Sequence, residues 1–163
     1  MSDSSGQDLV ILNLNRALQA LVEAQTIQQT KKIVDIARAA EIFARRQRLG
    51  GEAIACAYDV KLMALRSLGQ LLREMPKATG GDAQRTRFHK EIESPPTLAD
   101  LGIDKKTSMI AQRLADLPQA EFERVRDGRT PMAQVLRAAK SATTSRVAWT
   151  PDSAEQRLLA AIN

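Results

Sequence analysis

The longest apolar repeat of this chain lies in residues 51–76, GEAIACAYDVKLMALRSLGQLLREMP. Its large apolar residues recur every three or four positions, which is the spacing of one face of an α-helix. These residues are Ile54, Tyr58, Leu62, Leu65, Leu68, Leu72 and Met75. Pro76 lacks a backbone donor and ends the pattern. We therefore predict a helix over about 52–75, whose apolar seam either lies inside the molecule or pairs with a second copy of the chain.

Two more helices are predicted before this one. The first covers about 8–24, where Ile11, Leu14, Leu18 and Leu21 share one side. Thr26 and Gln29 have the spacing of a capping box, which starts a second helix that runs to about residue 48. Gly50 and Gly51 are expected to end it in the left-handed conformation. We expect these three helices to pack as antiparallel rods.

The composition excludes several classes of protein. Of 163 residues 44% are apolar, 26% are charged and only 3% are aromatic, which favours helices over a β-sandwich or barrel. A single cysteine, Cys56, and a single histidine, His89, can form neither an internal disulfide nor a Cys/His zinc site. No apolar stretch has the length of a membrane span, and the polar N-terminus does not resemble a signal peptide. We expect a cytoplasmic protein without a cofactor.

The remaining sequence divides into three parts. Residues 77–96 contain Gly80-Gly81 and Pro95-Pro96 without an apolar repeat, so we interpret them as a flexible linker. Short capped helices are predicted over 97–145, and a final helix within 146–163. The predicted fold class is all-α, with an N-terminal bundle of long helices (1–76) joined by the linker to a small helix-turn-helix domain.

The helix-turn-helix prediction rests on residues 97–114, TLADLGIDKKTSMIAQRL. A short helix is expected from Thr97, a sharp turn at Gly102, and a second helix from Lys105 that is capped by Asp104. In such motifs the second helix enters the major groove of DNA. The other interpretation of this pattern is an ordinary helical corner with a solvated polar face.

The outward side of the second helix carries the candidate DNA-binding residues. Lysines at its N-terminus suit phosphates or a guanine edge, while glutamine and arginine can form paired hydrogen bonds to adenine and guanine. The candidates are Lys105, Lys106, Ser108, Met109, Gln112 and Arg113. Arg85, Arg87 and Lys90 of the linker either follow the DNA backbone or are simply solvated. The net charge of +5 permits a polyanionic partner without demanding one.

Part of this region resembles a known family. Residues 112–118, QRLADLP, and 122–130, FERVRDGRT, are similar to the part of ParB-type partition proteins that follows their helix-turn-helix. The resemblance covers about 97–140 and implies a small all-helical DNA-binding unit in which residues 105–113 form the reading helix. The arginine-rich nucleotide-binding box of full partition proteins is missing from this sequence, so clamp-like CTP chemistry is not implied.

A second resemblance covers about 30–140. Residues 61–81, KLMALRSLGQLLREMPKATGG, and 96–106, PTLADLGIDKK, resemble a set of small phage and prophage proteins. This resemblance suggests an origin in a mobile element and transfers no activity, because the group itself is largely uncharacterised.

Together these patterns predict a DNA-binding protein rather than an enzyme, since no catalytic or metal-binding constellation emerges. Its expected role is that of a regulator or accessory factor of a phage or other mobile element. A homodimer is expected, because two half-sites increase the affinity of one short reading helix. The alternative is a helical adaptor that docks a protein partner through its N-terminal helices without contacting DNA.

Overall fold

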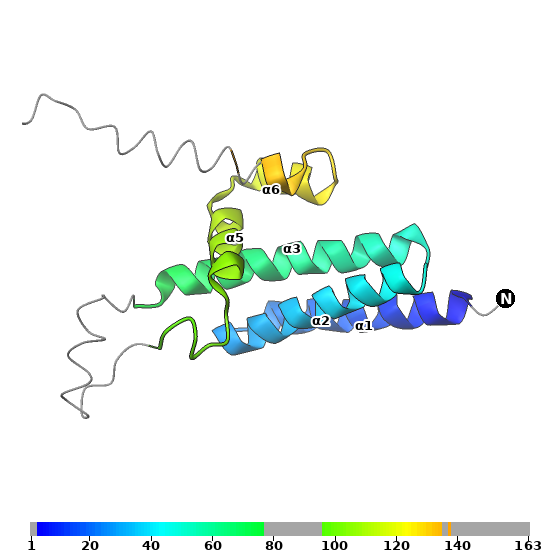
Figure 1. Cartoon of the computed structure of the whole chain (residues 1–163), viewed down its shortest axis with the longest axis horizontal. Coiled ribbons are helices and arrows are strands. Elements are labelled where there is room, and N and C mark those ends of the chain that lie inside the picture. Colours follow the sequence, from blue (N-terminus) through cyan, green and yellow to red (C-terminus); the bar gives the residue numbers. More distant parts are fainter. Residues whose placement is uncertain (1–2, 77–95, 135–136, 138–163) are drawn as a thin grey trace, which may run out of the picture. The chain divides into compact units, whose positions relative to one another are not determined.

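The protein is all-α, as the sequence predicts (Figure 1). The computed structural model describes residues 3–76, 96–134 and 137. Within these residues no β-strand occurs. The helices are α1 (Asp3–Glu23), α2 (Ile27–Arg46), α3 (Gly51–Glu74), α5 (Lys105–Asp116) and α6 (Gln119–Arg126).

The three long helices form an antiparallel bundle (Figure 1). The apolar core between them is closed, and its completely buried side chains include Leu14, Leu62 and Leu68. Leu65 and Leu72 of the α3 seam are also buried within the single chain, at 2% and 3% exposure. The seam is therefore internal core, and the alternative that it pairs with a second copy is wrong.

The start of α2 is the predicted capping box. The backbone N–H of Gln29 donates to Thr26 Oγ1 at 3.2 Å, and the backbone N–H of Thr26 donates to Gln29 Oε1 at 3.2 Å. Two backbone donors that the first helical turn leaves without partners are satisfied in this way. The cap fixes where the chain turns from α1 into α2.

The end of α2 differs from the prediction. The left-handed residue is Arg48, with φ of 53°, whereas Gly50 has φ of −54° and precedes α3 as its N-cap residue. The backbone N–H of Leu49 donates to the carbonyl of Ala44 at 2.9 Å, which is the long-range bond of a Schellman motif. Burial of Leu49 in the core places the turn two residues earlier than the glycines suggest.

By its contacts the chain divides into two units, Met1–Arg129 and Thr130–Asn163. The first unit contains α5 and α6 together with the three long helices, because α5 packs extensively against α3. In the second unit residues 132–134 are helical, and the backbone N–H of Gln134 donates to the carbonyl of Pro131 at 2.9 Å. None of the described helices combines the length and hydropathy that a bilayer crossing requires.

Candidate nucleic-acid interface

Helix α5 begins at a well-formed cap. Asp104 Oδ1 accepts a hydrogen bond from the backbone N–H of Thr107 at 2.7 Å, and Asp104 Oδ2 accepts one from Thr107 Oγ1 at 2.5 Å. These hydrogen bonds from Thr107 hold the pKa of Asp104 below its usual value. The predicted start of this helix at Lys105 and its cap at Asp104 are both confirmed.

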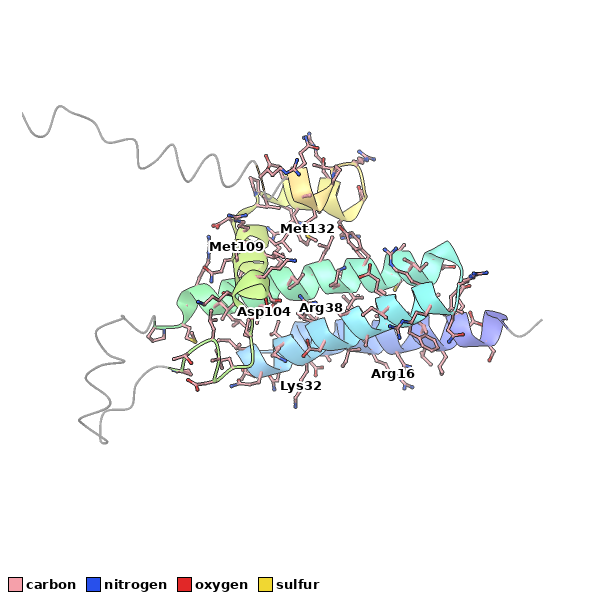
Figure 2. The ribbon with its side chains drawn as sticks, in the orientation of Figure 1. Arg16, Lys32, Arg38, Asp104, Met109 and Met132 are labelled. Carbon is pink, nitrogen blue, oxygen red and sulfur yellow. The ribbon has the colours of Figure 1, made fainter. Side chains whose placement is uncertain are left out.

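The same cap attaches α5 to the bundle. Arg38 of α2 donates from Nη2 to Thr107 Oγ1 at 2.9 Å, and the Thr107 side chain is buried. Figure 2 shows Arg38 between α2 and the N-terminal end of α5, close to Asp104. The beginning of α5 is therefore fixed by a chain of polar contacts that runs from α2 through Thr107 to the capping carboxylate.

One side of α5 is packed against the protein. Its buried residues are Thr107, Ser108, Ala111 and Leu114. At Ala111 the helix backbone lies directly against Gly69 of α3. Because the buried residues follow the helical period, the opposite side of α5 faces solvent.

The structure places the candidate DNA-binding residues unequally. Lys105, Lys106 and Met109 are exposed, and Gln112 and Arg113 are half-buried. Ser108 was expected to face outward, and this orientation is wrong. It is only 3% exposed, because it lies beside Thr107 and three residues before Ala111 on the packed side. Its Oγ accepts a hydrogen bond from Gln112 Nε2 at 3.0 Å, which draws the amide of Gln112 toward the protein.

The segment before α5 is a turn and not the short helix that the sequence predicts. The backbone N–H of Leu101 donates to the carbonyl of Thr97 at 3.2 Å, and that of Ile103 donates to Leu98 at 2.8 Å. Thr97 and Asp100 bond to each other in the manner of a capping box, but the left-handed Gly102 follows after too few residues for a helix to continue. Helices α2 and α3 support α5 in place of a preceding short helix.

Arg66 of α3 holds the connection between α5 and α6. Its Nη2 donates to the carbonyl of Leu117 at 3.1 Å, its Nη1 donates to Gln119 Oε1 at 2.6 Å, and its guanidinium lies 4.4 Å from the ring centroid of Phe122. Arg73 and Asp116 form an ion pair at the end of α5. These contacts fix the C-terminal end of α5 as Arg38 fixes its beginning.

Another ion pair, between Asp59 and Arg126, joins α3 to α6. Asp59 Oδ1 lies 2.7 Å from Nε of Arg126, although the two atoms lack the geometry of a hydrogen bond. Burial raises the pKa of Asp59, the Arg126 charge opposes this rise, and the nearby Asp127 adds to it. The pair joins α6 to α3, but the pKa of Asp59 stays above its ordinary value because burial outweighs the charge of Arg126.

Three residues that position α5 are not among the candidates that the sequence predicts: Arg38, Gly69 and Arg66. The sequence contains one indication of the role of Gly69, because a glycine within an apolar helical seam marks a close approach of another backbone. The sequence contains no such indication for the two arginines, because their partners are 69 and 51 residues away. The predicted backbone contacts Arg85, Arg87 and Lys90 lie outside the described residues, as does the predicted helix within 146–163.

The described residues contain no group of three His, Cys, Asp or Glu side chains that could hold a metal ion. Burial raises the pKa of the Cys56 thiol, and the nearby Asp59 and Glu52 charges raise it further. The thiol is therefore less nucleophilic than a free cysteine.

A scan against protein-family models matches none, and searches of curated proteins and of solved structures find no match. The function is therefore inferred from the geometry of α5 and from the charges on its surface.

Proposed function

We propose that this protein binds double-stranded DNA through the exposed side of α5, with Lys105 and Lys106 as its main contacts. One observation carries the proposal. The first two residues of α5 are exposed lysines, while the opposite side of the same helix is anchored to α2 and α3. A helix that is fixed along one side presents its other side in a single orientation, which limits the entropy lost on binding.

The electrostatics of the helix start favour an anionic ligand. The N-terminal end of a helix carries a partial positive charge, and two ammonium groups are added to it here. The first turn of α5 contains no acidic residue, and the carboxylate of the capping Asp104 is occupied by Thr107. Phosphate groups of a DNA backbone match this surface, because each lysine that neutralises a phosphate releases a condensed counterion.

The dimensions of α5 also fit a groove. Its 12 residues span about 18 Å at the ordinary rise of a helix, and the major groove of B-DNA is about 12 Å wide. Met109 lies one turn beyond Lys105 and is 42% exposed, so it can contact the methyl group of a thymine. A role as a regulator or accessory factor of a phage or other mobile element is supported by the resemblance of residues 61–81 and 96–106 alone.

Fluorescence anisotropy of a labelled duplex tests the proposal at about 50 and 200 mM salt. We expect binding that weakens steeply with salt, and we expect Lys105→Ala/Lys106→Ala to reduce the slope of log K against log salt by about one per lysine. Arg124→Ala/Arg129→Ala is a matched control, because it removes the same charge from two exposed positions outside α5.

Two results would contradict the proposal. The first is no binding of the full chain at the lower salt concentration. The second is an equal loss of affinity in the lysine variant and in the arginine control, since binding would then depend on net charge and not on α5. A selection from random duplexes would further show whether base contacts add specificity to the phosphate contacts.

A further inference from the structure

The exposed apolar surface of this protein lies on α1 and α2, away from the proposed DNA-binding side. Seven large apolar side chains are exposed in the described residues, and only Met109 belongs to α5. The other six are Leu9, Leu12, Val22, Ile36, Ile42 and Phe43. Contiguous apolar surface on a soluble domain marks a site of association.

On α2 these residues form part of a regular exposed stripe. It consists of Lys32, Ile36, Ala39, Phe43 and Arg46, all of which are exposed. Their spacings of four, three, four and three residues place them along one side of the helix. Ile36 is 49% exposed and Phe43 is 47% exposed, although the residue after each of them, Ala37 or Ala44, is buried. We call this the α2 stripe: apolar in its middle and cationic at both ends.

Helix α1 has a stripe whose end charges are opposite to those of the α2 stripe. Its exposed residues include Asp8, Leu9, Leu12, Arg16 and Glu23, so carboxylates stand near both ends. Figure 2 shows Arg16 of this α1 stripe and Lys32 of the α2 stripe along the same edge of the bundle, on the side away from α3. The two stripes therefore face the same direction and form one surface.

The end charges of the two stripes are matched in spacing. Asp8 and Glu23 are 15 residues apart on α1, and Lys32 and Arg46 are 14 residues apart on α2, which corresponds to about 21–22 Å along each helix. None of these four side chains forms an ion pair within residues 3–76, 96–134 and 137.

We infer that this surface is a homodimer interface in which α1 of each protomer lies antiparallel on α2 of its partner. A two-fold axis parallel to the helices produces this arrangement, because it exchanges the positions of α1 and α2 across the interface. One register then places Asp8 beside Arg46 of the partner subunit and Glu23 beside Lys32 of the partner subunit. The same register places Leu12 against Phe43 of the partner subunit.

The charges on the two stripes and the area of the surface both favour a second copy of the chain as the binding partner. Pairing of α2 with the same helix of a second copy would place Lys32 against Arg46 of the partner subunit, which is repulsive. The surface is two helices wide and about 30 Å long, so that about 1,200 Å² is buried in total, at the lower end of the range for stable interfaces. The inference does not depend on DNA binding and concerns a different side of the protein.

Sedimentation equilibrium of the full chain up to about 200 µM tests the interface. We expect a dimer, and we expect Leu9→Glu/Phe43→Glu to weaken it roughly a hundredfold or more, because each change occurs twice in the interface. Met109→Glu is the control. Met109 is also a large apolar side chain that is exposed, at 42%, but it belongs to α5 and to neither stripe.

Charge reversal gives a second measurement on residues that are already exposed, so that folding is preserved. Glu23→Lys and Lys32→Glu should each weaken the dimer, and the combined variant should recover it, because each new lysine then faces a new glutamate of the partner subunit. A monomeric wild-type chain would overturn the inference. So would a dimer that the Leu9/Phe43 variant leaves intact, one that Met109→Glu disrupts equally, or a combined charge variant that shows no recovery.

Discussion

Gly69 and Ala111 bring the backbones of α3 and α5 into direct contact. A Cβ atom built on Gly69 would lie 2.0 Å from the carbonyl oxygen of Ala111 and 2.4 Å from its carbonyl carbon. Glycine inside a helix ordinarily costs about 0.5–1 kcal/mol relative to alanine. Its presence inside α3 is therefore explained by α5, which crosses there.

Gly69→Ala is expected to destabilise the protein by about 3 kcal/mol, because backbone atoms and not a flexible side chain would have to move. The free energy of unfolding from urea titration measures this loss. In the proposed function, displacement of α5 should also reduce DNA affinity in the same variant.

Gly51→Ala is the matched control in the same helix. Gly51 is the first residue of α3, and an added Cβ would meet no atom within 4 Å. We expect an unchanged free energy of unfolding or a gain of about 0.5 kcal/mol, since alanine restricts the unfolded chain. A similar gain in both variants would show that helix propensity, and not the backbone contact, decides the effect of the change at Gly69.

The cap of α5 should depend more on hydrogen-bond acceptance than on charge. Asp104→Ala removes both bonds from Thr107 and should lower the midpoint of thermal unfolding. Asp104→Asn should preserve most of the cap, because asparagine is an equally good N-cap residue. If the two variants lose the same stability, the charge near Arg38 matters more than the cap.

The lowered pKa of Asp104 also predicts how the stability of the folded chain changes with pH. A carboxyl group whose pKa is depressed by folding contributes stability above its ordinary pKa of 3.8, and this contribution is lost as the pH falls through the lowered value. Asp100 behaves in the same way, because hydrogen bonds from Thr97 lower its pKa. Acid should therefore loosen the turn and the start of α5, as hydrogen exchange across 97–107 can measure.

Arg66 requires its planar guanidinium to contact the α5–α6 connection. Arg66→Lys keeps the charge but cannot bond to Leu117 and Gln119 while lying over the Phe122 ring. We expect it to lose about 1–2 kcal/mol, nearly as much as Arg66→Ala. Faster hydrogen exchange in α6 but not in α1 would confirm a local effect. A lysine variant with wild-type exchange would show that charge alone suffices.

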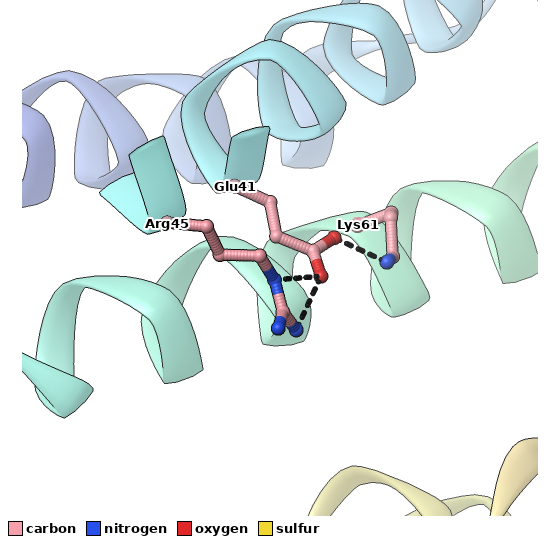
Figure 3. A network of polar contacts seen from close by, with 3 residues as sticks. All are labelled: Glu41, Arg45 and Lys61. Carbon is pink, nitrogen blue, oxygen red and sulfur yellow. Dashed lines mark hydrogen bonds and ion pairs between the residues drawn. The ribbon is translucent and has the colours of Figure 1, made fainter. Parts of the chain in front are cut away.

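Glu41 connects α2 to α3 (Figure 3). It accepts hydrogen bonds from Lys61 and, at 3.0 Å, from Nη2 of Arg45. Burial alone would raise the pKa of Glu41, but these cations lower it below 4.5. Glu41→Gln should therefore reduce the free energy of unfolding at pH 7 by about 1–2 kcal/mol, between the values for exposed and buried pairs.

The pH dependence of this effect has a defined sign. Because folding lowers the pKa of Glu41, its contribution is present above pH 4.5 and is lost as the pH falls through the lowered pKa, so wild type and Glu41→Gln should converge on acidification. Asp35→Asn is the control, since its pair with Lys31 is more exposed and should contribute about 0–0.5 kcal/mol. A Glu41 effect as small as the Asp35 effect would show that the network contributes little.

The sequence alone determined the helical class and the local starts and stops of its helices. Apolar spacing placed α1, α2 and α3, and the capping patterns at Thr26 and Asp104 located two helix starts correctly. These features depend on residues within one or two turns of each other, so the sequence pattern contains the information directly. Lys105, Lys106 and Met109 were also placed on the exposed side by helical period.

Only the tertiary structure decided what surrounds each helix. The α3 seam could have been core or interface, and burial of Leu62 and Leu68 made it core. Ser108 turned inward, because α5 packs on α3 at Gly69 and bonds to α2 at Arg38. Such contacts join residues dozens of positions apart, and their energy depends on shape and distance in the folded chain, which no local pattern of residues specifies.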